Sequence, residues 1–299
     1  MTAGWEHADL FDVMPADSGL LSEFWKNQVT ETMRWQMAYR TRTTKAGERL
    51  EAEIYPIWGR DQEKAARKAR QNRTPERQKQ LNMKRSKHML TLMLETNFRA
   101  DEDIHVTLTY QDEPDLERML MDIRNFFGRI RRLREKRGLA PLKYIYAIGR
   151  DAGKRLHAHV VMNGGIDRDE LEKNWKKGNS RATYRRGVAN TYRLQEYGTG
   201  LQGMASYLFK QNEAAKEGGE RDGLRMWNGS RNLKKPYIRT SDTKMSCRRV
   251  KMLAMDFQAV ATEVMEKVYP GYRLETGKVL LSDVVDGVYI RCVMRRLRL

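Results

Sequence analysis

Two histidines one residue apart are the side chains of this chain best suited to metal chemistry. His157 and His159 lie in the apolar run Leu156–Met162. Side chains two apart in a strand point to the same face, so the two imidazoles are expected side by side, with a divalent metal ion as their ligand. The alternative is that each histidine is packed or hydrogen-bonded, which is the commoner role of a single histidine on a strand.

A tyrosine further along the chain offers a nucleophile. Tyr207 and Lys210 occur in LQGMASYLFKQ, where helical spacing places a phenol and an ammonium on one face. The phenol can attack phosphorus and the ammonium can meet phosphate charge, although a helix tyrosine by itself is usually a core residue. Two histidines, a metal and one tyrosine together predict cleavage of a phosphodiester through a covalent phosphotyrosine.

The charge of the chain predicts a polyanionic partner. The 299 residues include 57 Lys and Arg against 39 Asp and Glu, a formal net charge of +18, which favours nucleic acid. A hydrophobic content of 40% argues against general disorder.

The cysteines and the apolar runs concern the compartment. Cys247 and Cys292 are too few for a disulfide framework or a zinc site of paired CxxC knuckles, which favours a reducing environment. No run reaches the roughly 20 apolar residues of a membrane span, and the first residues lack the pattern of a signal peptide. We therefore expect a protein of the cytoplasm with no membrane partner.

Hydrophobic periodicity predicts an alternation of strands and helices around these residues. Period-two patterns or turn signals predict strands at 49–56, 103–110, 142–148 and 156–162, and a hairpin with an Asp-Gly turn at 286–287. Helical spacing predicts helices at 75–97, at 115–137, from Asp167 through DRDELEKNWKK, around Tyr207, and at 251–268.

Several basic residues are candidate DNA contacts. They are Arg155 next to the two-histidine strand, and Arg231, Lys234 and Lys235 in the segment SRNLKKP. The helical stretch from Arg60 to His88, with eleven Lys or Arg against three acids, is either a solvated surface or a phosphate-binding one. SRNLKKP has the same two interpretations, a clamp on a DNA strand or an exposed connection.

The order of three motifs resembles a known superfamily. HVTLTY, then RLHAHVVMNGG, then GMASYLFK is similar to the motif set of the HUH endonucleases, specifically the rolling-circle replication initiator (Rep) proteins of bacterial plasmids, phages and integrative elements. Further segments, among them EAEIYPIW and YIRCVMRR, extend the resemblance from about residue 40 to the C-terminus.

The resemblance implies a role for each motif residue. His157 and His159 would ligate Mn²⁺ or Mg²⁺, and imidazole suits Mn²⁺ better. Tyr207 would attack a phosphate of single-stranded DNA at a replication origin, leaving a 5′-phosphotyrosine and a free 3′-OH, and the same site could later rejoin the strand. Lys210 would orient the phosphate and help to activate the phenol.

One part of the resemblance is incomplete. Such sites have a third protein ligand, expected as an acidic residue where this chain has Gly149. Asp151 or Gln211 could substitute, the latter in the manner of single-tyrosine transposases, and His105 is a further candidate. A single motif tyrosine also means that termination needs a second subunit or water, so a dimer is an open alternative. Host helicase and polymerase are the other expected partners.

The fold class implied is α+β. We expect an antiparallel five-stranded HUH endonuclease sheet of the RRM or ferredoxin-like type with helices on one side, and the tyrosine helix across the exposed face. A basic helical N-terminal region (1–98), the endonuclease domain (99–250) and a C-terminal helix and β-hairpin packed on that domain (251–299) complete the expected organisation.

Two other functional classes stay open. A single-tyrosine transposase or a relaxase would use the same chemistry for a different purpose. A non-catalytic, basic nucleic-acid-binding protein would use the charge alone, with the histidines as structural residues.

Overall fold

The chain forms two compact units. The computed structural model describes residues 23–33, 37–149, 155–176, 186–196, 200–217, 225–282 and 285–297. The first unit combines Met1–Arg85 with Pro236–Leu299, and the second is Ser86–Lys235. The boundary at Arg85 falls inside the helix α4 (Pro75–Asn97).

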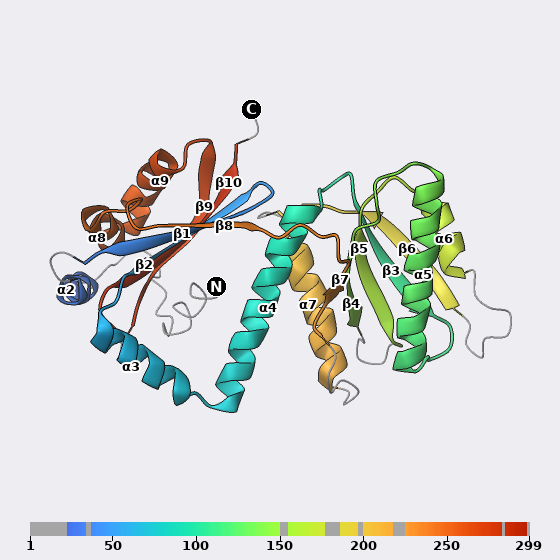
Figure 1. Ribbon diagram of the computed structural model, residues 1–299, viewed down its shortest axis with the longest axis horizontal. Helices are drawn as coiled ribbons and strands as arrows, with labels where there is room; N and C mark the ends of the chain where they lie inside the picture. Colours follow the sequence, from blue (N-terminus) through green and yellow to red (C-terminus); the bar gives the residue numbers. More distant parts are fainter. Residues whose placement is uncertain are drawn as a thin grey trace. The chain divides into compact units, whose positions relative to one another are not determined.

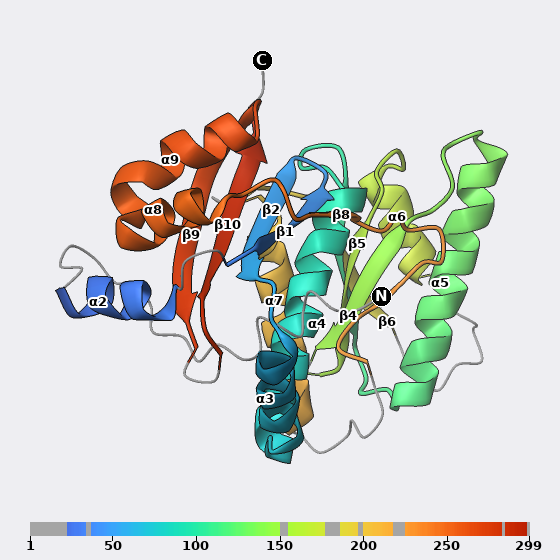
Figure 2. The same ribbon diagram turned by 60° about the vertical axis from the view of Figure 1, so that its left-hand side comes forward.

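The second unit contains an antiparallel sheet of five strands in the order β6-β3-β5-β4-β7. The strands are β3 (Ile104–Tyr110), β4 (Tyr144–Gly149), β5 (His157–Met162), β6 (Arg186–Arg193) and the short β7 (Asn228–Gly229). Helices α5 (Leu116–Lys136) and α6 (Arg168–Lys176) cover one face, and α7 (Gln202–Glu217) lies on the other, against β4 (Figures 1 and 2). The expected α+β fold with a five-stranded antiparallel sheet is therefore confirmed.

Strand alternation explains why this sheet has one apolar and one polar face. Ala158, Val160 and Met162 of β5 are fully buried in a core shared with α5 and α6, while His157 and His159 point to the other side because side chains alternate along a strand. The arrangement predicted from the period-two pattern, with apolar side chains packed behind the two imidazoles, is correct.

The first unit contains a second five-stranded sheet, which the sequence did not predict as a sheet. Its order is β8-β1-β2-β10-β9, all antiparallel. The strands are β1 (Tyr39–Ala46), β2 (Arg49–Pro56), β8 (Tyr237–Ser241), β9 (Tyr272–Leu281) and β10 (Val288–Arg296). Helices α2 (Glu23–Thr32), α8 (Cys247–Met255) and α9 (Phe257–Val268) share its core, and α3 (Arg60–Gln71) packs its alanines beside Tyr289 and Trp58.

The C-terminal segment differs from the expectation in two ways. The helix expected at 251–268 is two helices, because Asp256 interrupts it and caps α9 by accepting a hydrogen bond from the Ala259 N–H. The C-terminal hairpin is present, but β10 pairs with β2. The last third of the chain thus completes a sheet with N-terminal strands, and the three-part division into 1–98, 99–250 and 251–299 differs from the two compact units.

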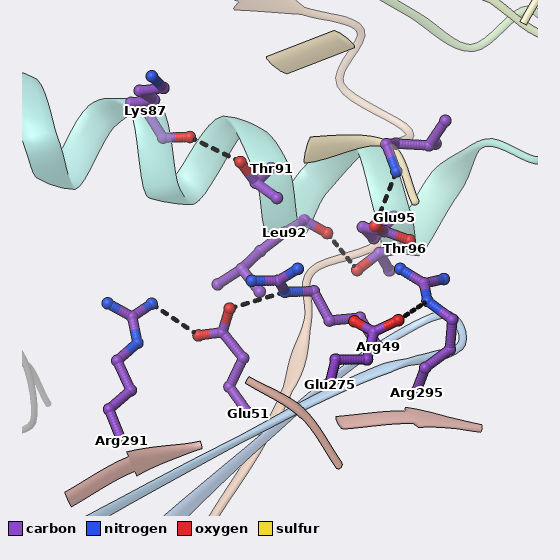
Figure 3. Close-up of polar contacts among 11 residues, drawn as sticks. Arg49, Glu51, Lys87, Thr91, Leu92, Glu95, Thr96, Glu275, Arg291 and Arg295 are labelled. Atoms are coloured by element: carbon purple, nitrogen blue, oxygen red, sulfur yellow. Dashed lines mark hydrogen bonds and ion pairs between the residues drawn. The ribbon is translucent and has the colours of Figure 1, made fainter. Parts of the chain in front are cut away.

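The polar face of the first sheet is filled by ion pairs (Figure 3). The carboxylate of Glu51, buried on β2, accepts hydrogen bonds from Arg49 at 2.8 Å and from Arg291 at 3.0 Å, and Glu275 accepts one from Arg295 at 2.9 Å. Buried charges need such partners because an unpaired one would be costly to desolvate. These groups stabilise the fold of the first unit.

None of the helices that the structure describes is both long enough and apolar enough to cross a membrane.

Candidate active site

The two histidines of β5 meet on the polar face of the second sheet, as predicted. Their ring centroids are 4.8 Å apart with the planes nearly perpendicular, and the two residues are only 7% and 2% exposed. β5 lies between β3 and β4, with His159 opposite Thr107 on one side and Ala147 on the other. A central strand holds both rings in place because each neighbour fixes its register.

The hydrogen bonding of His157 leaves one ring nitrogen available. Its Nδ1 lies 3.0 Å from the carbonyl oxygen of Arg155. A carbonyl only accepts, so Nδ1 carries the proton and Nε2 presents its lone pair. A backbone carbonyl that fixes the tautomer in this way is a common feature of histidines that ligate metals.

His159 connects the sheet to the tyrosine. Its Nε2 lies 3.5 Å from the hydroxyl of Tyr207, and the two rings are in edge contact with centroids 4.9 Å apart. On the other side of the ring, Nδ1 lies 3.2 Å from the Thr107 hydroxyl. α7 therefore delivers the candidate nucleophile to the histidine pair, although Tyr207 follows His159 by 48 positions in the chain.

His105 supports His159 from β3. Its Nε2 is 3.3 Å from His159 Nδ1, and the two rings are stacked. Burial lowers the pKa of His105 to about 4, so this imidazole is neutral near pH 7. His105 contacts the nitrogen of His159 that faces away from Tyr207, which suits the orientation of His159 better than shared ligation with His157.

Gln211 approaches the histidines where the sheet has a glycine. A Cβ built on Gly149 would lie 2.9 Å from His157 Nε2 and 3.2 Å from Gln211 Cβ, so the missing side chain is what lets α7 come close. The Gln211 side-chain oxygen is buried and has no hydrogen-bond partner in the described structure. A buried acceptor without a donor is costly unless something else binds it.

These donors fit a divalent cation. Two neutral imidazoles and an amide oxygen form a mixed nitrogen and oxygen set, which suits Mn²⁺ better than Mg²⁺. Within the described ranges, no group of three or more His, Cys, Asp or Glu side chains is arranged to hold a metal ion. The third ligand in this part of the chain is then the Gln211 oxygen, whereas the other candidate, Asp151, lies outside the described residues.

An open cleft of about 1010 Å³ surrounds the site. It is lined from β3, β5, β6 and α7, and Arg155 is among the lining residues. Lys210 is exposed on α7 and does not line it, so its role in orienting phosphate stays a prediction. The lining residues that the sequence did not single out include Asn190, Tyr192 and Met204.

The other predicted DNA contacts lie elsewhere in the second unit. Arg231, Lys234 and Lys235 are not buried and do not line the cleft. The backbone of Lys234 is held by both side-chain atoms of Asn97, whose oxygen accepts at 2.7 Å and whose amide donates at 2.8 Å. The structure thus groups Arg155 with the histidines and places the SRNLKKP segment along the end of α4.

The comparison with known protein families supports a role in replication. Residues 103–212 match the model of a family described as replication-associated proteins of the ORF2 type. The matched stretch runs from β3 to α7 and includes the two histidines, Tyr207, Lys210 and Gln211. Searches of curated proteins and of solved structures gave no match. The match supports a replication initiator of the Rep type, with DNA at a replication origin as its partner.

Proposed function

We propose that the protein initiates rolling-circle replication by nicking single-stranded origin DNA and later rejoining the strand. The observation that carries the proposal is the meeting of His157, His159 and the Tyr207 hydroxyl within one cleft. The reaction would be a transesterification. The Tyr207 oxygen forms a bond to phosphorus, the bond from phosphorus to the 3′ oxygen breaks, and a 5′-phosphotyrosine and a free 3′-OH result.

The residues of the chain have separate tasks in this reaction. His157, His159 and Gln211 would hold Mn²⁺ or Mg²⁺, which supplies Lewis-acid polarisation of the scissile phosphate when bound. His159 positions the phenol, and His105 and Thr107 hold His159. Tyr207 is 41% exposed, so its proton can leave to water and the attacking oxygen is accessible to a strand. Arg155 and Lys210 would contact phosphate.

The proposal assigns partners outside the chain. The free 3′-OH would prime a host polymerase in the bacterial cytoplasm while a host helicase separates the strands. One nucleophilic tyrosine per chain cleaves once, so termination would use a second subunit or a water molecule.

A single-tyrosine transposase is the second candidate, and one observation favours it. Gln211, four residues after Tyr207, reaches the His157 region, which is the ligand arrangement that the resemblance to those enzymes implies. The chemistry would be the same, and the DNA would differ. Cleavage of an origin on a supercoiled plasmid favours the initiator, and cleavage confined to hairpins at element ends favours the transposase.

Trapping of the covalent adduct tests the proposal. A pool of single-stranded oligonucleotides, labelled at the 3′ end because the protein stays attached to that fragment, is incubated with protein and Mn²⁺. We expect a labelled adduct on a denaturing gel that is lost in Tyr207→Phe and with chelator. The exposed Tyr237 of the first unit provides a matched control, Tyr237→Phe, which should retain the adduct. Salt-sensitive DNA binding without any adduct would establish the non-catalytic alternative.

A further inference from the structure

The edge strand β6 extends the polar face of the second sheet beyond the histidines. Tyr192 pairs with His105 and Asn190 pairs with Thr107. Residues directly opposite each other in an antiparallel pair share a face, so Tyr192 and Asn190 lie on the same side as the histidines. Both line the cleft.

This part of the cleft is exposed, unlike its centre. Tyr192 is 58% exposed and Val188, four positions earlier on the same face, is 46% exposed, whereas His105 is 8% exposed. α7 packs against β4, on the other side of the central strands from β6. A large aromatic ring at an exposed sheet edge favours unwanted association unless it has a partner.

A cation accompanies the ring. The guanidinium carbon of Arg168, at the start of α6, lies 5.9 Å from the centroid of the Tyr192 ring, and Arg168 is itself exposed. The group therefore offers a π surface, an amide with a donor and an acceptor, and a positive charge. These match the base face, the base edge and the phosphate of one nucleotide.

We propose that Tyr192, Asn190 and Arg168 form a nucleotide platform that binds one base of the single-stranded DNA beside the scissile phosphate. The Tyr192 ring stacks on the base, the Asn190 amide bonds to its edge, and Arg168 contacts a phosphate. The inference rests on the proposed function because it takes single-stranded DNA as the ligand. It assigns a share of sequence preference to β6, apart from the residues that cleave.

The test measures binding under conditions that prevent cleavage. Fluorescence anisotropy of a labelled single-stranded oligonucleotide is recorded in chelator with Tyr192→Ala, Tyr192→Trp and the matched control Tyr237→Ala, which removes a tyrosine 62% exposed on β8. We expect about tenfold weaker binding for Tyr192→Ala. Tyr192→Trp and Tyr237→Ala should bind as the wild type does.

Two further measurements test the separate parts of the platform. A fluorescent base analogue moved along the oligonucleotide should be quenched at one position by the wild type and by Tyr192→Trp, and not by Tyr192→Ala. Asn190→Ala should relax the base preference at that position in a selection from a randomised pool.

Three results would overturn the platform. They are equal losses in Tyr192→Ala and Tyr237→Ala, unchanged binding in Tyr192→Ala, or a change of oligomeric state in Tyr192→Ala on size-exclusion chromatography, which would make this edge an interface between copies of the chain. Because binding is measured without metal, failure of the protein to nick DNA would leave the result intact. Tight binding to β6 without any covalent adduct would separate the two proposals.

Discussion

The two sheets of this protein have the same strand number and direction but use their polar faces differently. In the first unit, the carboxylate of Glu51 is shared by two arginines, and Glu275 is paired with Arg295. In the second unit, the described residues that line the cleft include no carboxylate, and the nearby Gln211 side-chain oxygen has no donor among them.

The difference separates a structural polar face from a reactive one. Paired charges satisfy each other and leave little capacity for a ligand. Neutral imidazoles with a free lone pair, an exposed phenol and an unsatisfied amide oxygen are satisfied only by something that binds. The comparison predicts that substitutions in the first sheet change stability, and that substitutions in the second change metal binding and cleavage.

The largest effect is expected for the histidines. His159→Ala should lower the rate of adduct formation at least about 1000-fold, because it removes a ligand of the cation and the group that positions Tyr207. Affinity for single-stranded DNA should change by less than about threefold, since phosphate contacts supply most of the binding. Gel assays of adduct formation and anisotropy measure the two quantities.

His88 on α4 supplies the matched control, because it does not line the cleft. His88→Ala should form the adduct at the wild-type rate. If His159→Ala lost DNA affinity and cleavage to the same degree, the assignment of His159 to a metal site would be wrong.

The next largest effect is expected in the first sheet. Glu51→Gln removes the charge that Arg49 and Arg291 share and leaves buried cations uncompensated, so the free energy of unfolding should fall by about 3 kcal/mol. Urea unfolding at neutral pH measures the change. The folded variant should still form the adduct at the wild-type rate. A loss of cleavage by fully folded Glu51→Gln would break the comparison.

A smaller effect is expected for the third ligand. Gln211→Ala should weaken Mn²⁺ binding about 10- to 100-fold, the range seen when groups around a metal are altered. Gln211→Glu should keep or strengthen it by supplying a carboxylate. Titration followed by Mn²⁺ electron paramagnetic resonance measures the affinity without DNA. Unchanged affinity in Gln211→Ala would exclude the amide as a ligand and leave Asp151 as the candidate.

The smallest effect is expected for an exposed ion pair of the first unit. Asp242 accepts two hydrogen bonds from Arg40, at 2.6 and 2.8 Å, and these bonds lower the pKa of its carboxyl group. Both side chains are well exposed, so water and salt screen the pair. Asp242→Asn should leave the urea midpoint at the wild-type value. A shift as large as that of Glu51→Gln would show that burial is not what makes an ion pair important here.

Local pattern predicted most of the second unit. The spacing of apolar residues predicted α5, where Ile123, Phe126 and Ile130 are buried, and alternation predicted β3 and β5. These predictions succeed because each face of an element contacts one environment along its whole length. The first unit was less predictable, since its sheet joins strands from both ends of the chain, such as Ile54 with Ile290.

The candidate site was predicted in part for the same reason. His157 and His159 are neighbours in one strand, so their common face follows from the sequence. Tyr192 was not singled out, because its value depends on pairing with His105 across the sheet.

The sequence by itself determined the residue types, the alternation that places two imidazoles on one face of β5, and the helical spacing of Tyr207, Lys210 and Gln211. Only the tertiary structure decided which face of the sheet stays polar, that α7 crosses it, and that Gly149 leaves room for Gln211. The physical reason is that periodicity acts over a few residues, whereas strand register and helix docking depend on contacts between distant segments, which no local pattern encodes.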